Sequence, residues 1–237
     1  MEAVNENNAY TKMQLAHYQN EGRDINGGMN KENHMFHNNN PEYWSILVKD
    51  TEDPSFKNKI GLDFGCGCGR NILNLHDRFL KFDGVDIASN LIERTRENLI
   101  KKNIPTNSFD LYTCNGINLS VIKNNNYYDF IMSTIVLQHI CVYDIRLSYL
   151  KEFYRLLKKD GILSFQMGFG KGHGKVSYFD NYYQATSTNS GCDVIVSSPD
   201  EIINDLKNIG FNNITYKFGQ PYADGHEKWI FIRCIKS

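Results

Sequence analysis

The sequence predicts an α/β fold, a doubly wound and mainly parallel sheet with helices on both faces. Three observations support this expectation. Short apolar runs alternate with segments of helical periodicity from about residue 60 onward. The first run, Ile60–Phe64, leads into a loop with glycine at every second position and then into a helical pattern. Residues 1–59 are polar, rich in asparagine and outside this alternation.

Strands are expected where short runs are mostly apolar and are bounded by turn-forming residues. The run at 127–133 is apolar enough to lie in the interior of the sheet. Because strands and helices alternate, consecutive strands should be joined by helices that pack on the sheet. The predicted strands are residues 60–64, 82–86, 108–113, 127–133, 161–167, 213–218 and 229–235.

Helices are expected where apolar residues recur three or four positions apart. The clearest start is Ser198-Pro199-Asp200-Glu201, which combines a cap residue, a proline at the first helical position and two acids. Ser89 is the expected cap of an earlier helix, and Lys158-Lys159-Asp160-Gly161 predicts a helix end and a turn before the fifth strand. The apolar stripes are Ile72, Leu75 and Phe79; Ile92, Thr95 and Leu99; Ile145, Tyr149, Phe153 and Leu156; and Ile202, Leu206 and Ile209.

The chain is expected to divide into an N-terminal helical lid, residues 1–55, and one larger domain, residues 56–237. The lid should contain a helix around Tyr10–Gln19 and a second that starts at Asn40-Pro41. An insertion at residues 168–198 is first glycine-rich and then aromatic. It follows the fifth strand, where it could form a wall on the substrate side.

The composition excludes several classes of protein. The 237 residues carry a net charge of −1, which gives no electrostatic reason to expect nucleic acid or a membrane surface as a partner. There is no apolar run of about 18 residues and no signal-peptide pattern at the start, so we expect a cytoplasmic protein. The six cysteines are scattered, which indicates reduced thiols. Neither Cys66-x-Cys68 nor His34-x-x-His37 is completed by further ligands, and no metal is expected.

The spacing of the glycine loop decides between ligands. A dehydrogenase fingerprint places its third glycine three positions after the second, and that position is Arg70 here, so the fit fails. Asp63 ends the strand before the loop, and Asp86 ends the second strand, 21 residues after Gly65. A carboxylate at that tip can accept hydrogen bonds from both hydroxyls of a ribose. The alternative for Asp86 is a turn or cap acid at the end of a strand.

Six motifs follow in order along the chain: Leu62-Asp63-Phe64-Gly65-Cys66-Gly67-Cys68-Gly69-Arg70, Gly84-Val85-Asp86-Ile87, Cys114-Asn115-Gly116, Tyr128-Asp129-Phe130-Ile131-Met132-Ser133, Val136-Leu137-Gln138-His139-Ile140 and Leu156-Leu157-Lys158-Lys159-Asp160-Gly161-Ile162-Leu163. With these motifs, most of residues 55–235 resembles the class I S-adenosylmethionine-dependent methyltransferases. The resemblance implies a Rossmann-like, seven-stranded sheet that ends in an antiparallel strand. It implies S-adenosyl-L-methionine as cofactor and leaves the methyl acceptor open.

The resemblance also implies roles for individual positions. Asp63 and the loop from Gly65 through Cys66 to Gly67 would hold the methionyl part of the cofactor. Arg70 would reach its carboxylate, since a guanidinium forks onto two oxygens. Asp86 would hold the ribose. The remaining cofactor-side candidates are Ile87 against the adenine, Asn115 with Gly116 near the adenine amine, Ser133 in the fourth motif, and Tyr18 and Trp44 of the lid.

Asn115 departs from the family pattern, which usually has an aspartate at that position. An amide oxygen can still accept a hydrogen bond from the adenine amine. The lid aromatics are candidates because the face of an aromatic ring attracts a cation such as the sulfonium. Helix packing on the edge of the sheet is the alternative for them.

Two histidines are the candidates for a catalytic base. His139 follows the fourth strand by six residues, near the carboxyl edge where open sheets bind ligands. Its alternative role is to organise the loop. His226 lies in a polar cluster with Asp224 and Glu227 before the last strand, and an Asp-Gly turn is the alternative there. In the insertion, His173 and Lys175 could attract an anion, and Tyr182 and Tyr183 could line the pocket.

We therefore expect methyl transfer from S-adenosylmethionine to an oxygen or nitrogen of a small-molecule acceptor. The alternatives are methylation of a peptide or protein side chain, and a non-catalytic protein that binds S-adenosylmethionine. Aminopropyl transfer would want an acidic pocket, and no acidic cluster follows the fourth strand. No nucleic acid and no membrane are expected as partners, and the oligomeric state is left open.

Overall fold

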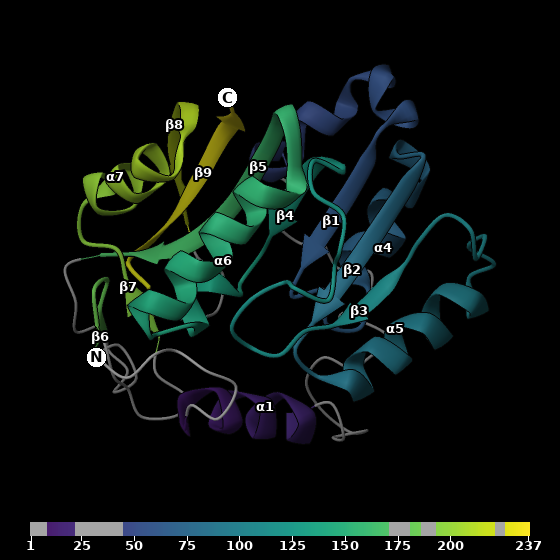
Figure 1. The fold of residues 1–237 in the computed structure, drawn as a ribbon, viewed down its shortest axis with the longest axis horizontal. Coiled ribbons are helices and arrows are strands. Elements are labelled where there is room, and N and C mark those ends of the chain that lie inside the picture. The colour runs from purple at the N-terminus through teal and green to yellow at the C-terminus, as the bar shows by residue number, and fades with distance from the viewer. Residues whose placement is uncertain (1–8, 22–44, 171–180, 186–192, 221–225) are drawn as a thin grey trace.

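A seven-stranded sheet forms the centre of the molecule (Figure 1). The structure is a computed structural model that describes residues 9–21, 45–170, 181–185, 193–220 and 226–237. The strand order is β3-β2-β1-β4-β5-β9-β8. The strands are β1 Ile60–Phe64, β2 Lys81–Asp86, β3 Leu111–Thr113, β4 Tyr128–Ser133, β5 Leu157–Phe169, β8 Phe211–Gly219 and β9 Lys228–Lys236.

The first five strands pair in parallel, and β9 is antiparallel to both β5 and β8. This arrangement confirms the predicted doubly wound, mainly parallel sheet with a final antiparallel strand. The chain moves outward from β1 to β2 and β3, and then returns to the other side of β1 with β4. Ligands of open α/β sheets bind at the carboxyl ends of the strands at such a reversal. The loops after β1 and β4 are therefore the first place to look for a site.

Helices connect the strands and cover both faces of the sheet. The α-helices are α1 Ala9–Glu21, α4 Arg70–Leu75, α5 Ser89–Lys101, α6 Tyr143–Leu156 and α7 Pro199–Ile209, and the short 3-10 helices are η2 Lys49–Glu52, η3 Pro54–Asn58, η4 His76–Arg78 and η5 Leu137–His139. The predicted start of α7 is confirmed, because Ser198 and Glu201 form a capping box. The cap predicted for α5 is wrong by one residue: Ala88 is the N-cap and Ser89 is already helical.

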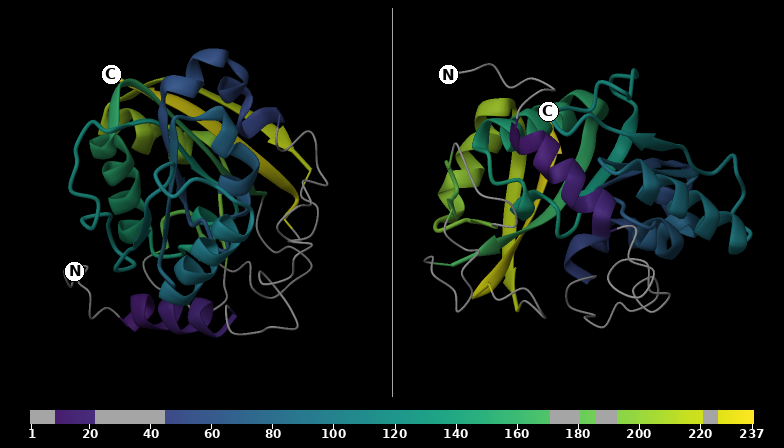
Figure 2. Two further views of the ribbon diagram at one scale, coloured as in Figure 1. Left: turned by 90° about the vertical axis from the view of Figure 1, so that its right-hand side faces the viewer. Right: turned by 90° about the horizontal axis from the view of Figure 1, so that it is seen from below.

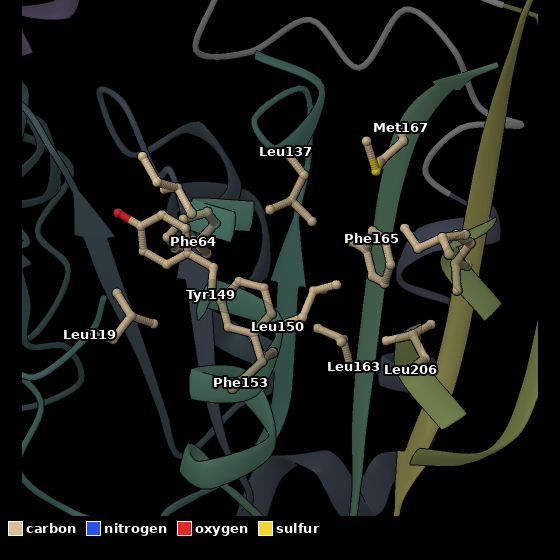
Figure 3. Close-up of a cluster of buried hydrophobic side chains, with 14 of the residues drawn as sticks. Phe64, Leu119, Leu137, Tyr149, Leu150, Phe153, Leu163, Phe165, Met167 and Leu206 are labelled. Atoms are coloured by element: carbon tan, nitrogen blue, oxygen red, sulfur yellow. The ribbon is translucent and has the colours of Figure 1, made fainter. Parts of the chain in front are cut away.

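Each face of the sheet has its own core, since side chains alternate along a strand. On one face, α6 and α7 pack on β-strand residues such as Phe64 and Phe165 (Figure 3). The ring centroid of Phe64 lies 4.6 Å from that of Tyr149 and 5.0 Å from that of Phe153. On the other face, residues from α4, α5, η3 and the segment before η2 bury Phe82, Phe130, Trp229 and Phe231, the last two from β9.

Several predicted elements differ in length from the structure; the strand predicted at 108–113, for example, is β3, which begins at Leu111. The helix after the glycine loop ends at Leu75 and continues as the 3-10 turn η4, so Phe79 is extended rather than helical. The predicted turn at 158–161 lies inside β5 instead of before it. Asp160 has φ +62 there, and the pairing with β4 shifts register, so these residues form an irregularity of one long strand.

Helix α1 lies across the end of the sheet where the parallel strands finish (Figure 2). Its residues contact the segments that follow three of these strands: the Gln19 carbonyl accepts a hydrogen bond from Asn90 in the first turn of α5, and Thr11 lies against Gly116 after β3. Tyr10 bonds to His139 after β4. The helix predicted at Tyr10–Gln19 is therefore confirmed. The start of the second N-terminal helix lies outside the described residues, which show helix at 45–47.

The segment after β5 contributes two short parallel strands, β6 Asn181–Tyr182 and β7 Val194–Ile195. Val196 continues from β7 into a bridge with Phe169 at the end of β5. Leu47, Val48 and Phe56 are buried in the core, and the division at residues 55 and 56 remains a prediction. Among the helices in the described ranges, none has the length and apolar character needed to span a membrane.

Candidate functional site

The glycine loop after β1 depends on backbone conformations that favour glycine. Gly65, Gly67 and Gly69 have φ values of +74°, +53° and +89°. A Cβ atom at Gly65 would lie 2.2 Å from the side chain of Val136, which comes from the loop after β4. Glycine is therefore required at position 65 both for the turn and for the close approach of the two loops.

Two side chains of α5 donate hydrogen bonds to backbone carbonyls of the glycine loop. The Thr95 hydroxyl donates to the carbonyl of Gly67 at 2.6 Å, and the Asn98 amide donates to the carbonyl of Cys68 at 3.1 Å. Cys66 and Cys68 are buried, and burial raises the pKa of the Cys68 thiol to about 11. Both cysteines are therefore neutral packing residues at neutral pH.

Asp86, at the end of β2, is buried beside the loop and joins it to the start of α5. One carboxylate oxygen accepts from the backbone N–H of Gly67 at 2.9 Å and the other from that of Ala88 at 3.0 Å. Burial raises the pKa of Asp86, and the backbone N–H donors oppose this rise. A carboxylate has about four acceptor sites, so these backbone donors leave capacity for a ribose hydroxyl.

Asp63 is fully buried at the end of β1 and has an oxygen without a partner. Its Oδ1 accepts from the amide of Asn71 at 3.0 Å, while Oδ2 has no hydrogen-bond partner among the described residues. The hydroxyl of Ser133, at the end of β4, is also buried without a partner in that part of the chain. Buried polar atoms are normally satisfied, so the unpartnered oxygen of Asp63 suits a polar ligand group.

Burial is the main cause that raises the pKa of Asp63 to about 7. The hydrogen bond from Asn71 and the positive charge of Arg70, the first residue of α4, work in the opposite direction. A cationic ligand group at Oδ2 would also lower the pKa of Asp63, because it favours the charged carboxylate.

The proposed adenine side lies under α1. Gly116 has φ +82, and a Cβ atom there would lie 2.5 Å from Thr11 and 2.8 Å from Ile87. Tyr18 and Ile87 both pack against a small cluster that includes Ala88. The structure thus brings Ile87, Gly116 and Tyr18 to one side of the loop. Trp44 lies outside the described residues.

Asn115 is engaged in its own turn. Its side-chain oxygen accepts from the backbone N–H groups of Ile117 and Asn118, at 2.9 and 3.0 Å. Such bonding is typical of an asparagine that shapes a turn. The amide oxygen suggested for the adenine amine therefore already has two donors, and a contact with adenine stays a hypothesis.

The two candidate bases, His139 and His226, both face the carboxylate of Asp193. His139 Nδ1 lies 2.5 Å from Asp193 Oδ1, and His226 Nε2 lies 3.9 Å from Asp193 Oδ2. Asp193 immediately precedes β7 and is buried, and His226 precedes β9. The imidazole of His139 is 29% exposed and that of His226 is 1% exposed, so only the first can readily meet a ligand.

A chain of amides connects this group to the loop beside the glycines. The amide of Gln138 donates to Asp193 at 3.3 Å, and that of Gln166 donates to Gln138 at 2.7 Å. The oxygen of Gln166 accepts from the backbone N–H of Ile135 at 2.9 Å. Ile135 has φ +56, an unusual conformation for a β-branched residue that requires support from its surroundings.

Other predicted wall residues have different roles. Tyr182 is 70% exposed, whereas Tyr183 is buried and its hydroxyl donates to Asp205 at 2.7 Å. Tyr183 packs on Arg146, so it is part of the core. His173, Lys175 and Asp224 lie outside the described residues, and Glu227 is exposed.

Sequence reasoning missed several residues that build the site. Asp193 has no local pattern around it, and only the fold brings it to the two histidines. Thr95 was assigned to an apolar stripe, although its hydroxyl holds the glycine loop. Asn71 donates to Asp63, and its position directly after the first motif is the feature of the sequence that could have indicated this role. Within the described ranges, no group of three or more His, Cys, Asp or Glu residues is arranged to hold a metal ion.

Comparison with known sequences identifies two similarities. The model of a family described as a methyltransferase domain matches residues 35–216. The ribosomal protein L11 methyltransferase of Fusobacterium nucleatum subsp. nucleatum is 33% identical over 124 residues, which is 51% of this chain and 36% of that protein. The chain thus matches only about a third of the length of this relative.

Solved structures share the fold at low identity. Phosphoethanolamine N-methyltransferase 2 of Haemonchus contortus, solved with phosphomonomethylethanolamine and S-adenosylhomocysteine, is 18% identical with a TM-score of 0.60, over 87% of this chain and 53% of its own. A methyltransferase of Methanosarcina mazei is 18% identical with a TM-score of 0.60, over 76% of this chain and 93% of its own. A cyclase is also similar, at 12% identity and a TM-score of 0.58, over 79% of this chain and 80% of its own. At these identities the likeness concerns the fold.

Proposed function

The chain belongs to the class I S-adenosylmethionine-dependent methyltransferases, and from this premise we propose that it methylates an oxygen or nitrogen of a small-molecule acceptor. One observation carries the proposal. A histidine held by a buried carboxylate, His139 with Asp193, lies at the carboxyl edge of the sheet beside the glycine loop. Such a pair suits an acceptor that must lose a proton when it gains a methyl group.

The cofactor assignments are proposals that rest on the contacts of the loop. Asp63 Oδ2, a buried oxygen without a partner in the described part of the chain, suits the ammonium group of the methionyl moiety. Arg70 suits the carboxylate of that moiety, and Asp86 suits the ribose. Ile87, which follows β2, and Gly116, which follows β3, lie close together under α1 and suit the adenine ring. When bound, the cofactor supplies an electrophilic methyl group on sulfur.

The protein then has two tasks in the reaction. The first is to align the acceptor atom with the methyl carbon, and such positioning can supply roughly 7–11 kcal/mol in favourable cases. The second is to take up the proton of a hydroxyl or ammonium acceptor. We assign the second task to His139, whose ring is partly exposed while its Nδ1 faces Asp193. The proton would go to Nε2, and the resulting imidazolium would pair with the Asp193 carboxylate.

The placement of α1 supports a small acceptor. The helix crosses the loops after β2, β3 and β4, and it is held to the last of these by Tyr10 and Gln14. A helix over the carboxyl edge restricts access to the site. A flexible macromolecular substrate would need an open groove at the same place.

A second candidate is a protein side chain as acceptor. The ribosomal protein L11 methyltransferase of Fusobacterium nucleatum subsp. nucleatum favours it through its 33% identity. The match covers 36% of that protein, so it supports a shared cofactor domain more directly than a shared acceptor.

Calorimetry with S-adenosylhomocysteine tests the cofactor site. Asp86→Asn should weaken binding by about 10- to 100-fold, because hydrogen bonds to a charged group contribute about 1.5–3 kcal/mol. Asp83→Asn is the matched control: Asp83 is buried on the same strand, but it accepts from Tyr128 and the backbone of Asp110, away from the loop. Failure of the wild-type protein to bind S-adenosylhomocysteine would refute the proposal.

Isotope transfer tests the acceptor. A metabolite extract and a protein extract are each incubated with the enzyme and S-adenosylmethionine that carries a labelled methyl group, and the products are followed by mass spectrometry. We expect label in a small molecule, and we expect His139→Gln to reduce it strongly while cofactor affinity changes little. Label only in a protein band would replace the first candidate by the second.

A further inference from the structure

We propose that Asp193 is a positioning residue that holds His139 with its proton on Nδ1. Its carboxylate also faces His226, so the protonation of His139 depends on both neighbours. The inference deepens the proposed function, since it concerns the group that would accept the proton of the methyl acceptor. It assigns roles to Asp193 and His226 that neither the cofactor site nor the fold requires.

The contacts of Asp193 support a specific placement. Its carboxylate is 6% exposed, and each oxygen faces a different histidine. Oδ1 lies 2.5 Å from His139 Nδ1, and Oδ2 accepts from the Gln138 amide at 3.3 Å. His226 Nε2 lies 3.9 Å from Oδ2, within range of an ion pair but beyond hydrogen-bond distance. A buried carboxylate needs such donors, because burial without partners strongly disfavours its charged form.

The tautomer of His139 follows from this contact. A carboxylate only accepts hydrogen bonds, so the nitrogen that faces it must carry the proton. In a neutral imidazole, a proton on Nδ1 leaves the lone pair on Nε2. Asp193 thereby makes Nε2 the basic nitrogen, and its negative charge stabilises the imidazolium that forms when a proton arrives.

His226 lies where the fold makes space for it. A Cβ atom on Gly168 of β5 would lie 1.9 Å from His226 Nε2, so any other residue at position 168 would exclude the ring from this place. The imidazole is 1% exposed, and its Nε2 lies 3.9 Å from Asp193 Oδ2. Glycine at position 168 and histidine at position 226 are therefore coupled through space.

Other titratable groups lie around Asp193 and the two histidines. The Tyr10 hydroxyl donates to the carbonyl of His139 and accepts from the N–H of Cys141. Burial raises the pKa of Tyr10 well above its usual range, so it stays neutral. Arg146 donates to the carbonyl of Ile140, and Glu227 packs beside Gly170.

Nuclear magnetic resonance of the full-length protein labelled with 15N-histidine tests the proposal without a methyl acceptor. In the wild type, the 15N shifts of His139 should indicate a proton on Nδ1 above its titration midpoint. In Asp193→Asn, which removes the charge, the midpoint should fall by about 1 pH unit or more. In Asp193→Ala, which also removes the contact, the proton should move mainly to Nε2. His226→Gln should change the midpoint of His139, because an amide then replaces the second ring that faces the carboxylate.

Asp205→Asn is the matched control. Asp205 is also buried, but it accepts from the hydroxyls of Tyr143 and Tyr183 at 2.8 and 2.7 Å, so the His139 midpoint should not change. An unchanged midpoint in Asp193→Asn, or equal shifts in both aspartate variants, overturns the role of Asp193. An unchanged midpoint in His226→Gln overturns the dependence on His226. These outcomes are independent of cofactor binding and label transfer, so they are distinguishable from a failure of the proposed function.

Discussion

At the scale of single residues, the proposed contact of Asp63 with the cofactor would couple proton binding to cofactor binding. Its carboxyl is fully buried, and burial raises its pKa to about 7. Below this pH the side chain is mainly protonated in the protein without ligand. The proposed ammonium partner favours the charged carboxylate, so binding should release the proton.

We therefore expect the affinity for S-adenosylhomocysteine to rise with pH up to about 7 and to level off above it. Well below pH 7, the rise should approach about tenfold per pH unit for one released proton. Titration calorimetry at pH 6 in buffers of different ionisation enthalpy should detect this proton directly.

Asp63→Asn provides the decisive comparison for this prediction. The variant should lose the pH dependence and should bind more weakly at pH 8, whereas Asp83→Asn should keep the wild-type slope. The burial of Asp83 also raises its pKa, so that control separates a carboxyl at the loop from any buried carboxyl on a neighbouring strand. A pH-independent affinity in the wild type would contradict the ammonium contact.

Residues near the glycine loop could be predicted from sequence because the motif is local. Asp63, Gly65 and Asp86 stand at fixed places relative to two strands and a turn, and the structure places them together. Asp193 lies 54 positions from His139 along the chain. Their contact depends on how the segment after β5 returns to the loop after β4, which no periodicity or spacing encodes.

At the scale of elements, two polar side chains attach α1 to the segment after β4. The Tyr10 hydroxyl donates to the carbonyl of His139 at 2.7 Å and accepts from the N–H of Cys141 at 2.8 Å. Gln14 donates to the same carbonyl at 3.1 Å. The helix therefore binds to the backbone of the segment that carries the proposed base.

Tyr10→Phe should loosen α1 while the sheet stays intact. The change leaves the buried N–H of Cys141 without its acceptor, which costs about 1–3 kcal/mol. Hydrogen exchange of the amides of α1 should then accelerate roughly 5- to 100-fold, with little change in β1 and β4. Lys12→Ala, on the exposed side of the same helix, should leave exchange as in the wild type. Equal exchange in both variants would show that Tyr10 does not anchor the helix.

The elements themselves were largely predictable because their signals are short-range. β1 has the predicted limits, and the capping box at Ser198 marks α7 as expected. The helix after the glycine loop is shorter than its stripe suggested, since Phe79 packs with Phe82 and Phe130 in the core instead of continuing the helix. Tertiary packing overrides periodicity at that point.

At the scale of the whole molecule, the proposed cofactor site depends on most of the sheet edge. The loop after β1, the end of β2, the turn after β3 and α1 contribute residues from distant parts of the chain. S-adenosylhomocysteine should therefore stabilise the folded domain as a unit. At about 100 times its Kd, it should add about 2.7 kcal/mol and raise Tm by about 5–10 °C for a chain of this size.

Differential scanning calorimetry checks this expectation, with NAD as the control ligand. NAD should leave Tm unchanged, because the glycine spacing does not fit a dinucleotide. At the same ligand concentration, Asp86→Asn should show a smaller rise than the wild type. An equal rise with NAD would contradict the assignment of the loop.

The strand order was predictable because the motifs indicated a known fold. The direction of β9 and the strand reversal beside β1 both agree with that expectation. The identity of the acceptor was not predictable. It depends on side chains that converge from the segment after β5, the approach to β9 and the loop after β4, and these carry no shared motif.

The position of α1 has a consequence for the order of events in a reaction cycle. Thr11 lies against Gly116 on the proposed donor side, and Tyr10, one residue earlier, is bonded to the backbone of His139 on the proposed acceptor side. A displacement of the helix that uncovers one side therefore uncovers the other. Release of the demethylated donor and entry of the next acceptor would then depend on the same displacement of α1 and occur at the same rate.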